Sequence, residues 1–410
     1  MSAAMIDDLP KLKAQLRRAE RLKKLKALAL IAPLVIFLLL AFVFPIGTML
    51  WRGIDNSEMQ LALPQTAQLL QQWDGQNLPS AEVFKSLASE LPSAQKSGAL
   101  GKYGRRLNYE DPTLKTLMTQ TLRKMPIEPP SDWSQTLPQI NPRWSDPKVW
   151  QALKNTAPRL TDRYLLASVD VERNAQGDLQ FVAPDKKVYL DIFQRTLIIS
   201  GTVTLVCLLL GFPLAYLLAT LPTGTSNLLM IFVLLPFWTS LLVRTAAWIV
   251  LLQSGGLVNN ALIGLGIIQE PLQLVFNRFG VIVAMTHILL PFMILPLYSV
   301  MKGISPSYQR AAISLGAHPF KAFWQVYVPQ TLAGVAAGTI LVFIMALGYY
   351  ITPALLGGPS DQMVSYYVAY YTNTTNNWSM AAALGSLLLI ATLVLYAVYN
   401  HLVNKNPVRR

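Results

Sequence analysis

The stretch Arg310–Pro329, RAAISLGAHPFKAFWQVYVP, decides the fold of this chain. It lies between two apolar segments that are each long enough to cross a bilayer. The stretch cannot be a span itself, because Arg310, His318 and Lys321 all fall within its 20 residues. This order of segments predicts a polar loop that projects from a membrane.

Local signals predict that this stretch, which we call the elbow, consists of two helices joined by a tight turn. Residues 307–315 have a helical pattern, and Gly316 is a suitable stop because only glycine reaches positive φ at little cost. A second helix is expected from about Pro319, since proline is favoured at helix starts. Its apolar face carries Phe320, Phe323 and Trp324. Such a knob is suited to a groove on another protein.

The composition is that of a membrane protein. Hydrophobic residues make up 53% of the chain and charged residues 13%, against about 25% charged residues in a soluble domain. The net charge of +13 is spread over flanks and loops, so it does not require a nucleic-acid partner. The single cysteine, Cys207, lies in an apolar run, which excludes an intrachain disulfide and favours a small buried hydrophobe.

Enzymatic motifs are missing from the sequence. It contains no phosphate-binding G-x-x-x-x-G-K-[ST] pattern, so ATP hydrolysis, if it drives this protein, belongs to another chain. We predict that this chain has no catalytic residue, no metal site and no bound cofactor, and that ATP and Mg²⁺ bind a partner ATPase.

Acidic residues are distributed very unevenly. From residue 191 onward the acids are Asp191, Glu270 and Asp361, whereas residues 52–190 hold 15 acids and 17 Lys/Arg. Residues 52–190, which we call the insert, therefore read as a soluble-like domain within a membrane chain. We expect it to be mostly α.

Three local patterns predict structure inside the insert. Asp111-Pro112 is expected to open a helix that runs to about Met125, and Ser145-Asp-Pro147 to open another, because each pairs a capping side chain with proline in the first turn. Alternation over 166–172, a turn at 174–177 and a return over 178–182 predict a small β-hairpin.

The N-terminal region predicts a membrane anchor. Residues 1–26 carry eight Lys/Arg and three acids, which is typical of an amphipathic helix on the inner membrane surface. Residues 27–51 form a charge-free run without a small-residue cleavage site, so we expect a retained span.

Five further spans are expected in the second half, and loop charges predict their orientation. The expected spans are Thr196–Leu221, Leu228–Leu252, Phe279–Met301, Thr331–Leu355 and Ser379–His401. The loop 302–330 and the tail 402–410 each carry three Lys/Arg, whereas the loops 253–278 and 354–378 carry only Arg278. By the positive-inside rule both termini and the elbow are cytoplasmic, and the insert is extracytoplasmic.

The elbow resembles the "EAA" loop of ABC importer permeases. In this sequence Ala311, Ala312, Gly316, Ala317, Phe323 and Pro329 fall on the spacing of that pattern. Arg310 departs from it, because the family usually has Glu there. A narrower similarity to permeases of spermidine/putrescine-type importers is carried by LPFWTSLLVR at 235–244 and YITPALLGG at 350–358. The resemblance covers a little over half of the chain.

This resemblance implies a type I ABC importer permease fold with six transmembrane helices in a bacterial inner membrane. It implies an ABC ATPase dimer inside, a second permease beside this chain and a solute-binding protein outside. The residues implied to contact the ATPase are Arg310, Ala311, Ala312, Gly316, Ala317, Phe320, Phe323 and Pro329. The five-helix core would span 191–401.

Candidate residues of a substrate pathway come from polar and aromatic side chains in or near the spans. They are Trp238, Arg244, His287, Tyr349 and Tyr350. Aromatic rings suit an ammonium ligand through cation–π attraction. Against a polyamine stands the lack of Asp or Glu inside any of the six expected spans. A structural role is the alternative for two of these residues. Arg244 would then pair with loop carbonyls or lipid headgroups, and His287 would form a hydrogen bond to a neighbouring helix.

Two other classes of protein remain as alternatives at this point. A secondary transporter or channel that works alone would need an ionisable coupling site in the membrane, for which His287 is the candidate. A membrane-anchored sensor would need a cytoplasmic output domain, and the tail at 402–410 is too short for one. The sequence favours an importer permease for a polyamine or a related small organic solute.

Overall fold

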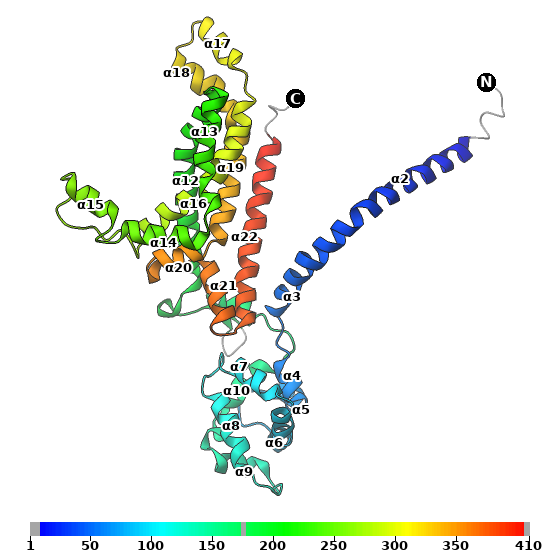
Figure 1. Ribbon diagram of the computed structural model, residues 1–410. Helices are drawn as coiled ribbons and strands as arrows, with labels where there is room; N and C mark the ends of the chain where they lie inside the picture. The colour runs from blue at the N-terminus through cyan, green and yellow to red at the C-terminus, as the bar shows by residue number, and fades with distance from the viewer. Residues whose placement is uncertain (1–8, 174–177, 406–410) are drawn as a thin grey trace. The chain divides into compact units, whose positions relative to one another are not determined.

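The computed structural model describes residues 9–173 and 178–405 (Figure 1). The expected hairpin turn at 174–177 lies outside the described residues. The chain divides into two compact units, Met1–Arg52 and Gly53–Arg410. Among the described residues, six helices are long and apolar enough to cross a membrane. This confirms the predicted helical membrane architecture.

The first unit is one helical run rather than a basic helix followed by a separate span. It consists of α2 (Leu9–Leu38), a π-helical turn η1 (Leu39–Val43) and α3 (Phe44–Arg52). The sequence has no stop signal between the basic and the apolar segment, so the helix continues through both. Its apolar part has a mean hydropathy of 3.0.

The insert is a helical domain with a two-stranded hairpin. Its elements are α4 (Glu58–Ala62), α5 (Pro64–Gln72), α6 (Ala81–Lys96), α7 (Ala99–Leu107), α8 (Leu114–Lys124), α9 (Trp133–Ile140), η2 (Pro142–Ser145), α10 (Pro147–Thr156), α11 (Arg163–Ala167), β1 (Val171–Arg173), β2 (Leu179–Phe181) and η3 (Pro184–Lys186). The core is built on large aromatic rings: Phe84 and Trp144 pack against Trp150 with ring centroids 4.5 Å and 5.2 Å apart. Both indole N–H groups are satisfied, by Thr121 Oγ1 and by the Trp144 carbonyl, each at 2.9 Å.

The local predictions inside the insert are only partly met. Asp146 caps α10 by accepting the Lys148 N–H at 2.9 Å, with Pro147 in the first turn, as expected. Helix α8 begins later than expected, at Leu114. The Asp111 carboxylate accepts the Thr113 N–H in the turn before the helix and does not cap the helix itself. The hairpin is shorter than expected, because residues 163–167 are helical.

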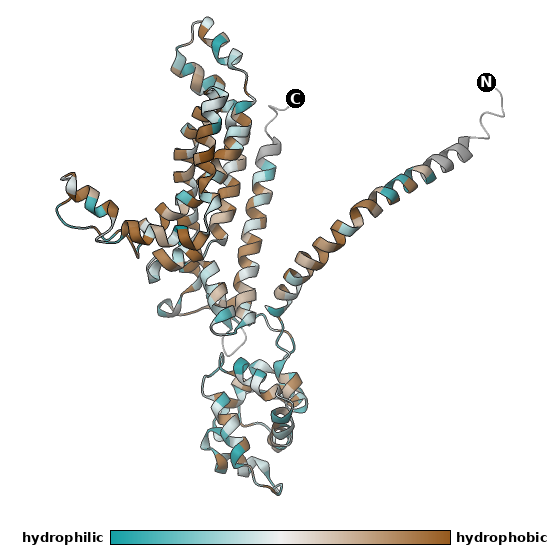
Figure 2. Ribbon diagram, in the orientation of Figure 1, coloured by the Kyte–Doolittle hydropathy of each residue, from teal (hydrophilic) through white to brown (hydrophobic). Residues whose placement is uncertain are grey.

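The second half forms a bundle around α16. Its elements are α12 (Tyr189–Thr220), α13 (Thr223–Leu234), η4 (Leu235–Trp238), α14 (Leu241–Leu252), α15 (Leu257–Gly264), α16 (Arg278–Lys302), α17 (Pro306–Ser314), α18 (Pro319–Ala322), η5 (Phe323–Tyr327), α19 (Val328–Gly348), α20 (Ile351–Leu356), η6 (Pro359–Asp361), α21 (Val364–Asn373) and α22 (Trp378–Lys405). Figure 2 shows hydrophobic residues along α12, α16 and α19.

Small residues allow α12 and α19 to approach α16 closely. A Cβ added at Gly211 of α12 or at Gly338 of α19 would lie within 2.9 Å of a Met293 side-chain atom of α16. At Gly334 it would meet the Pro296 carbonyl oxygen at 3.1 Å. In a membrane, where lipid is as apolar as leucine, such close packing is what holds helices together.

Two of the expected spans are wrong in their boundaries. Residues 228–252 do not form one helix: the chain passes from α13 into the 3-10 turn η4, is extended at Thr239, and restarts at α14 under a Ser240 cap. Pro236 lacks the N–H that a continuing helix needs, which explains the break. The span expected at 331–355 ends at Gly348, because Tyr349 is extended.

Candidate functional site

The elbow has the backbone geometry that its sequence predicts. Helix α17 ends in two reverse hydrogen bonds: Ala317 N–H donates to the Ala312 carbonyl at 3.0 Å, and Gly316 N–H to the Ile313 carbonyl at 2.9 Å. This is the Schellman arrangement, which requires a left-handed residue, and Gly316 has φ of +93°. His318 then caps α18, since its Nδ1 accepts the Phe320 N–H at 3.3 Å. The turn is therefore fixed at both helix ends.

Large apolar side chains of the elbow are exposed. Leu315 is 89% exposed, Phe320 68% and Trp324 53%. Arg310, Ala311 and Gly316 are exposed, whereas Ala312 and Ala317 are half-buried. Exposed leucine and aromatic side chains in one short loop are typical of a surface that another protein covers. Leu315 was not singled out by the sequence analysis, although its position beside Gly316 marks it as the tip of the turn.

Phe323 does not belong to this exposed surface. Its ring stacks on Tyr327 at 5.6 Å and meets the edge of Tyr216 at 5.3 Å. Tyr216 lies near the end of α12, and Tyr327 at the end of the π-helical turn η5 that leads into α19. We call these three rings the aromatic clasp. Phe323 therefore attaches the elbow to the bundle, and its expected contact with the ATPase stays a prediction.

Three of the five pathway candidates come together near the break before α14. The Arg244 guanidinium lies close enough to His287 and Tyr349 for its charge to act on both side chains. Trp248, one turn after Arg244, donates its indole N–H to His287 Nδ1 at 3.3 Å. Trp248 was missed by the sequence analysis, and its i,i+4 spacing from Arg244 was the available signal.

Arg244 is the least satisfied group in this cluster. Its Nε and Nη1 atoms are buried and have no hydrogen-bond partner among the described residues. Buried guanidinium donors normally find acceptors, because an unpaired one costs about 1–3 kcal/mol or more. The other two candidates lie at the surface of this chain: Trp238 is 84% exposed and Tyr350 40%.

A cavity of about 300 Å³ lies between α12, α13 and α16. It is almost entirely apolar, and His287 is its polar lining residue. Pro236 of the turn η4 and Pro291 inside α16 line it as well. The volume is at the lower limit for a small-molecule site.

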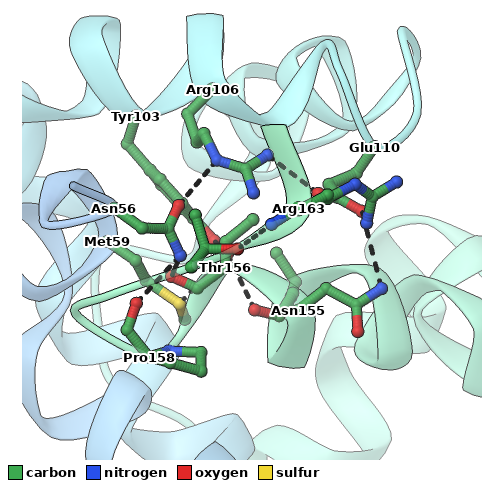
Figure 3. Close-up of polar contacts among 11 residues, drawn as sticks. Asn56, Met59, Tyr103, Arg106, Glu110, Asn155, Thr156, Pro158 and Arg163 are labelled. Atoms are coloured by element: carbon green, nitrogen blue, oxygen red, sulfur yellow. Dashed lines mark hydrogen bonds and ion pairs between the residues drawn. The ribbon is translucent and has the colours of Figure 1, made fainter. Parts of the chain in front are cut away.

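The insert is closed at its base by a buried polar network (Figure 3). Arg106 donates from Nε to Asn56 Oδ1 at 2.7 Å and from Nη1 to Glu110 Oε1 at 2.8 Å. The Arg106 and Glu110 side chains are 3% and 2% exposed. Arg163 also pairs with Glu110, and Asn56 donates to the Pro158 carbonyl at 2.8 Å. We call this set of residues the root network.

The root network holds together the two ends of the insert. Beside it, Asn56 N–H donates to the Arg159 carbonyl and Thr161 N–H to the Ile54 carbonyl, both at 2.9 Å. Desolvation raises the pKa of Tyr103 above its usual range, and its hydroxyl bonds Thr156 Oγ1 at 2.8 Å. These contacts join segments that are 53 to 107 residues apart in the sequence.

Asp170 connects the insert to α12. It is a non-glycine residue with φ of +54°, and its side chain is buried. Its carboxylate accepts the N–H groups of Val188, Tyr189 and Leu190 at 3.1, 3.1 and 2.7 Å. The first amides of α12, which have no partner within the helix, are thereby satisfied from the insert.

Packing strengthens the same joint. Tyr164 of α11 shares a buried cluster with Ile192 of α12 and with Val364, Met380 and Leu384 of α21 and α22. Tyr109 donates its hydroxyl to the Thr375 carbonyl at 3.3 Å. A backbone conformation that L-residues rarely adopt persists only where its surroundings determine it, as they do at Asp170.

Comparison with known proteins assigns the family. Residues 209–406 match the family described as "Binding-protein-dependent transport system inner membrane component". The spermidine/putrescine transport system permease protein PotB of Haemophilus influenzae is 34% identical over 221 residues, which cover 53% of this chain and 77% of PotB.

Two other proteins resemble this chain more distantly. The Salmonella paratyphi A protein named "Putative 2-aminoethylphosphonate transport system permease protein PhnU" is 26% identical over 55% of this chain and 78% of its own length. A crystal structure of a bacterial alginate ABC transporter gives a TM-score of 0.42 at 21% identity, covering 52% of this chain and 77% of the matched one.

The family assignment decides between the classes of protein that the sequence left open. Permeases of this kind act with a separate ATPase subunit and bind no cofactor, so the stand-alone carrier and the sensor are not retained. The chain belongs to the binding-protein-dependent transport system inner membrane components, and it is a multi-pass permease subunit of an ABC importer.

Proposed function

We propose that this chain forms half of the translocation pathway for a polyamine or a related small organic solute and couples to an ABC ATPase dimer through the elbow. The observation that carries this proposal is the exposed apolar tip of the elbow, with Leu315 and Phe320 held outward by a left-handed Gly316. A rigid turn with apolar side chains at its tip suits a pocket in a partner, because large anchors in pockets supply most of the binding energy of an interface.

The aromatic clasp gives this docking a mechanical consequence. Tyr216 belongs to α12, and Phe323 and Tyr327 continue without interruption into α19. Movement of the elbow by the ATPase would therefore be transmitted to two helices of the bundle at once. Packed aromatic rings transmit such displacement because protein interiors have low compressibility.

The topology that fits this role puts both termini, the elbow and the tail in the cytoplasm, and the insert outside. Lys302 lies just before the elbow, and Arg310 and Lys321 lie within it; the positive-inside rule assigns such short basic loops to the cytoplasm. The insert would then meet the extracytoplasmic solute-binding protein or the second permease. The unpaired donors of Arg244 support a second permease, since its carbonyl groups would satisfy them across the pathway.

The substrate proposal rests on the names of relatives and on the chemistry of the pathway. PotB is named for spermidine and putrescine, and PhnU for a solute that also carries an amine. Trp238, Arg244, His287, Tyr349 and Tyr350 are the residues that we expect along the route. A cation would bind to aromatic faces, to free carbonyls or to acids of the second permease.

The test is ATP hydrolysis in proteoliposomes by the complete importer, with and without the solute-binding protein. Gly316→Leu forces a branched residue into a left-handed turn, although its side chain meets open space. Gly224→Leu is the matched control, because Gly224 also faces open space and its φ is not in the left-handed region. We expect loss of ATPase assembly or stimulation in the first variant only.

Two results would contradict the proposal. Unchanged stimulation in Gly316→Leu would exclude the elbow as the coupling element, and transport without any ATPase would exclude the importer mechanism. For the substrate, the same assay compares stimulation by spermidine, putrescine and 2-aminoethylphosphonate. Stimulation by none of these solutes would reject the proposed class while leaving the coupling result intact.

A further inference from the structure

One face of the hairpin carries apolar side chains and Arg173, which pairs with Asp162. The register pairs Val171 with Phe181 and Arg173 with Leu179, so these four residues share one face of the ribbon. Leu179 is 59% exposed and Phe181 65%. The other face is polar, and there Gln180 donates to Glu172 at 3.1 Å.

A two-stranded ribbon of this kind needs a cover. An isolated hairpin is marginally stable in water, and an apolar face stabilises it only when something packs on that face. All three residues of β2 are exposed, so the other residues that the structure describes leave most of their surface uncovered. The cover must therefore come from outside this part of the chain.

The position of the hairpin identifies the bilayer as that cover. Strand β1 begins one residue after Asp170, whose carboxylate binds the first amides of α12. Because α12 is a membrane helix, its first residues lie at headgroup level, and the base of the hairpin is fixed at the same level. Near the start of α12, Leu190, Leu197 and Ile198 are also exposed apolar side chains, at 40–47%.

The charge beside this face fits lipid phosphate. Lys187 lies between β2 and α12, with its ammonium 5.3 Å from the centre of the Phe181 ring. The ion pairs found among the described residues include none for Lys187. A lysine stem over an aromatic ring, with a free ammonium at headgroup level, is typical of an interfacial anchor.

We propose that the hairpin is an interfacial membrane anchor of the insert, with Leu179 and Phe181 inserted at the acyl boundary of the outer leaflet and Lys187 bound to lipid phosphate. It holds the segment between the insert and α12 on the bilayer surface. The assignment to the outer leaflet rests on the topology proposed above, whereas the anchor itself depends neither on the substrate nor on coupling through the elbow.

Nitroxide accessibility in nanodiscs of phosphatidylethanolamine and phosphatidylglycerol tests this anchor in the full-length chain. Single cysteines replace Leu179 or Phe181 in a Cys207→Ala background and carry a spin label. The controls are Gln180→Cys on the opposite face and Ile127→Cys, which replaces a fully exposed side chain elsewhere in the insert. We expect the ratio of collisions with O₂ to collisions with a water-soluble nickel chelate to be at least about threefold higher at 179 and 181.

Either of two outcomes would overturn the anchor. Equal ratios at 179, 181 and 127 would place the apolar face in water. Low collision rates with both reagents, or a fall in both when the solute-binding protein or the second permease is added, would show that protein covers this face. Because the labelled side chains are exposed, the substitutions leave the fold intact, and normal labelling at 127 checks it.

Discussion

The elbow and the root network hold their shapes by opposite means. In the elbow, backbone hydrogen bonds over a few residues set the turn, and the large side chains point outward. In the root network, buried side chains from Asn56, Arg106 and Glu110 set the structure, and the segments that they join are far apart in the sequence. The elbow thus leaves its large side chains open to the partner proposed above, whereas the root network uses its side chains within the chain itself.

The largest loss of stability on substitution is expected in the root network. Arg106→Met leaves Glu110 buried with only the half-exposed Arg163 as an ionic partner, and breaking a buried pair in this way costs about 3–5 kcal/mol. Native-state hydrogen exchange of the full-length protein should show faster exchange throughout the insert and no change in the elbow.

Arg163→Ala is the control for this prediction. The Arg163 side chain is 45% exposed, so its loss should cost at most about 1 kcal/mol. Equal effects of the two substitutions would show that the burial of Arg106 is not what stabilises the root.

The next effect belongs to the exposed tip of the elbow. Phe320→Asp should weaken binding of the ATPase by about 2 kcal/mol, roughly 30-fold, because it removes an aromatic anchor from the interface. The thermal stability of the permease itself should not change. Quantitative pull-down of the ATPase from membranes measures the first effect, and a melting curve the second.

Phe323→Leu should affect the stability of the permease more than its binding to the ATPase. It loosens the aromatic clasp, so it lowers the stability of the permease by about 1 kcal/mol and affects ATPase binding less than Phe320→Asp does. If Phe323→Leu abolished ATPase binding in a permease of normal stability, the inward role of this ring would be wrong.

An effect of similar size, confined to the start of α12, is expected at Asp170. Asp170→Ala removes the acceptor for three amides of α12 and should cost about 1 kcal/mol, visible as faster exchange at residues 188–190. Asp170→Asn keeps an acceptor oxygen and tolerates the left-handed backbone, so it should lose less. Protection unchanged in both variants would show that the amides do not depend on this side chain.

The smallest effect concerns the insert surface at low pH. Hydrogen bonds from the Thr113 side chain and backbone, and then the Arg143 guanidinium, hold the pKa of Asp111 below its usual range. A carboxyl with a lowered pKa stabilises the fold above its unfolded pKa near 4 and loses that contribution as the pH falls through the lower folded value. Since the pair is about one-third exposed, Thr113→Ala should lower the stability of the insert at neutral pH by only about 0.3 kcal/mol, and denaturant unfolding of variant and wild type should converge as the pH falls below the folded pKa.

The sequence predicts the elbow well because its signals are local. The residues that set the turn act within one or two residues of their own positions, so their order in the sequence is enough to predict it. They are Gly316, His318 and Pro319. The break of the third expected span was predictable from the same kind of signal, since Ser240 follows Pro236 by four residues. The long apolar run outweighed it in the sequence analysis.

The root network could not have been predicted in the same way. Nothing in the sequence around Arg106 indicates Asn56 as its partner, because the pairing depends on how α7 and the two ends of the insert pack. The inward position of Phe323 depends likewise on Tyr216, more than 100 residues earlier. Contacts of this kind become visible only when the helices are placed in space.

Helix α12 connects the insert at one end to the aromatic clasp of the elbow at the other. Its first amides are bound by Asp170 of the insert, and Tyr216 near its last turn belongs to the aromatic clasp of the elbow. A helix of this length, 32 residues, is about 48 Å long, so a tilt of about 5° at one end displaces the other by about 4 Å. In the coupling and topology proposed above, the helix would act as a lever across the membrane, so that a load on the insert at one end is felt at the elbow at the other.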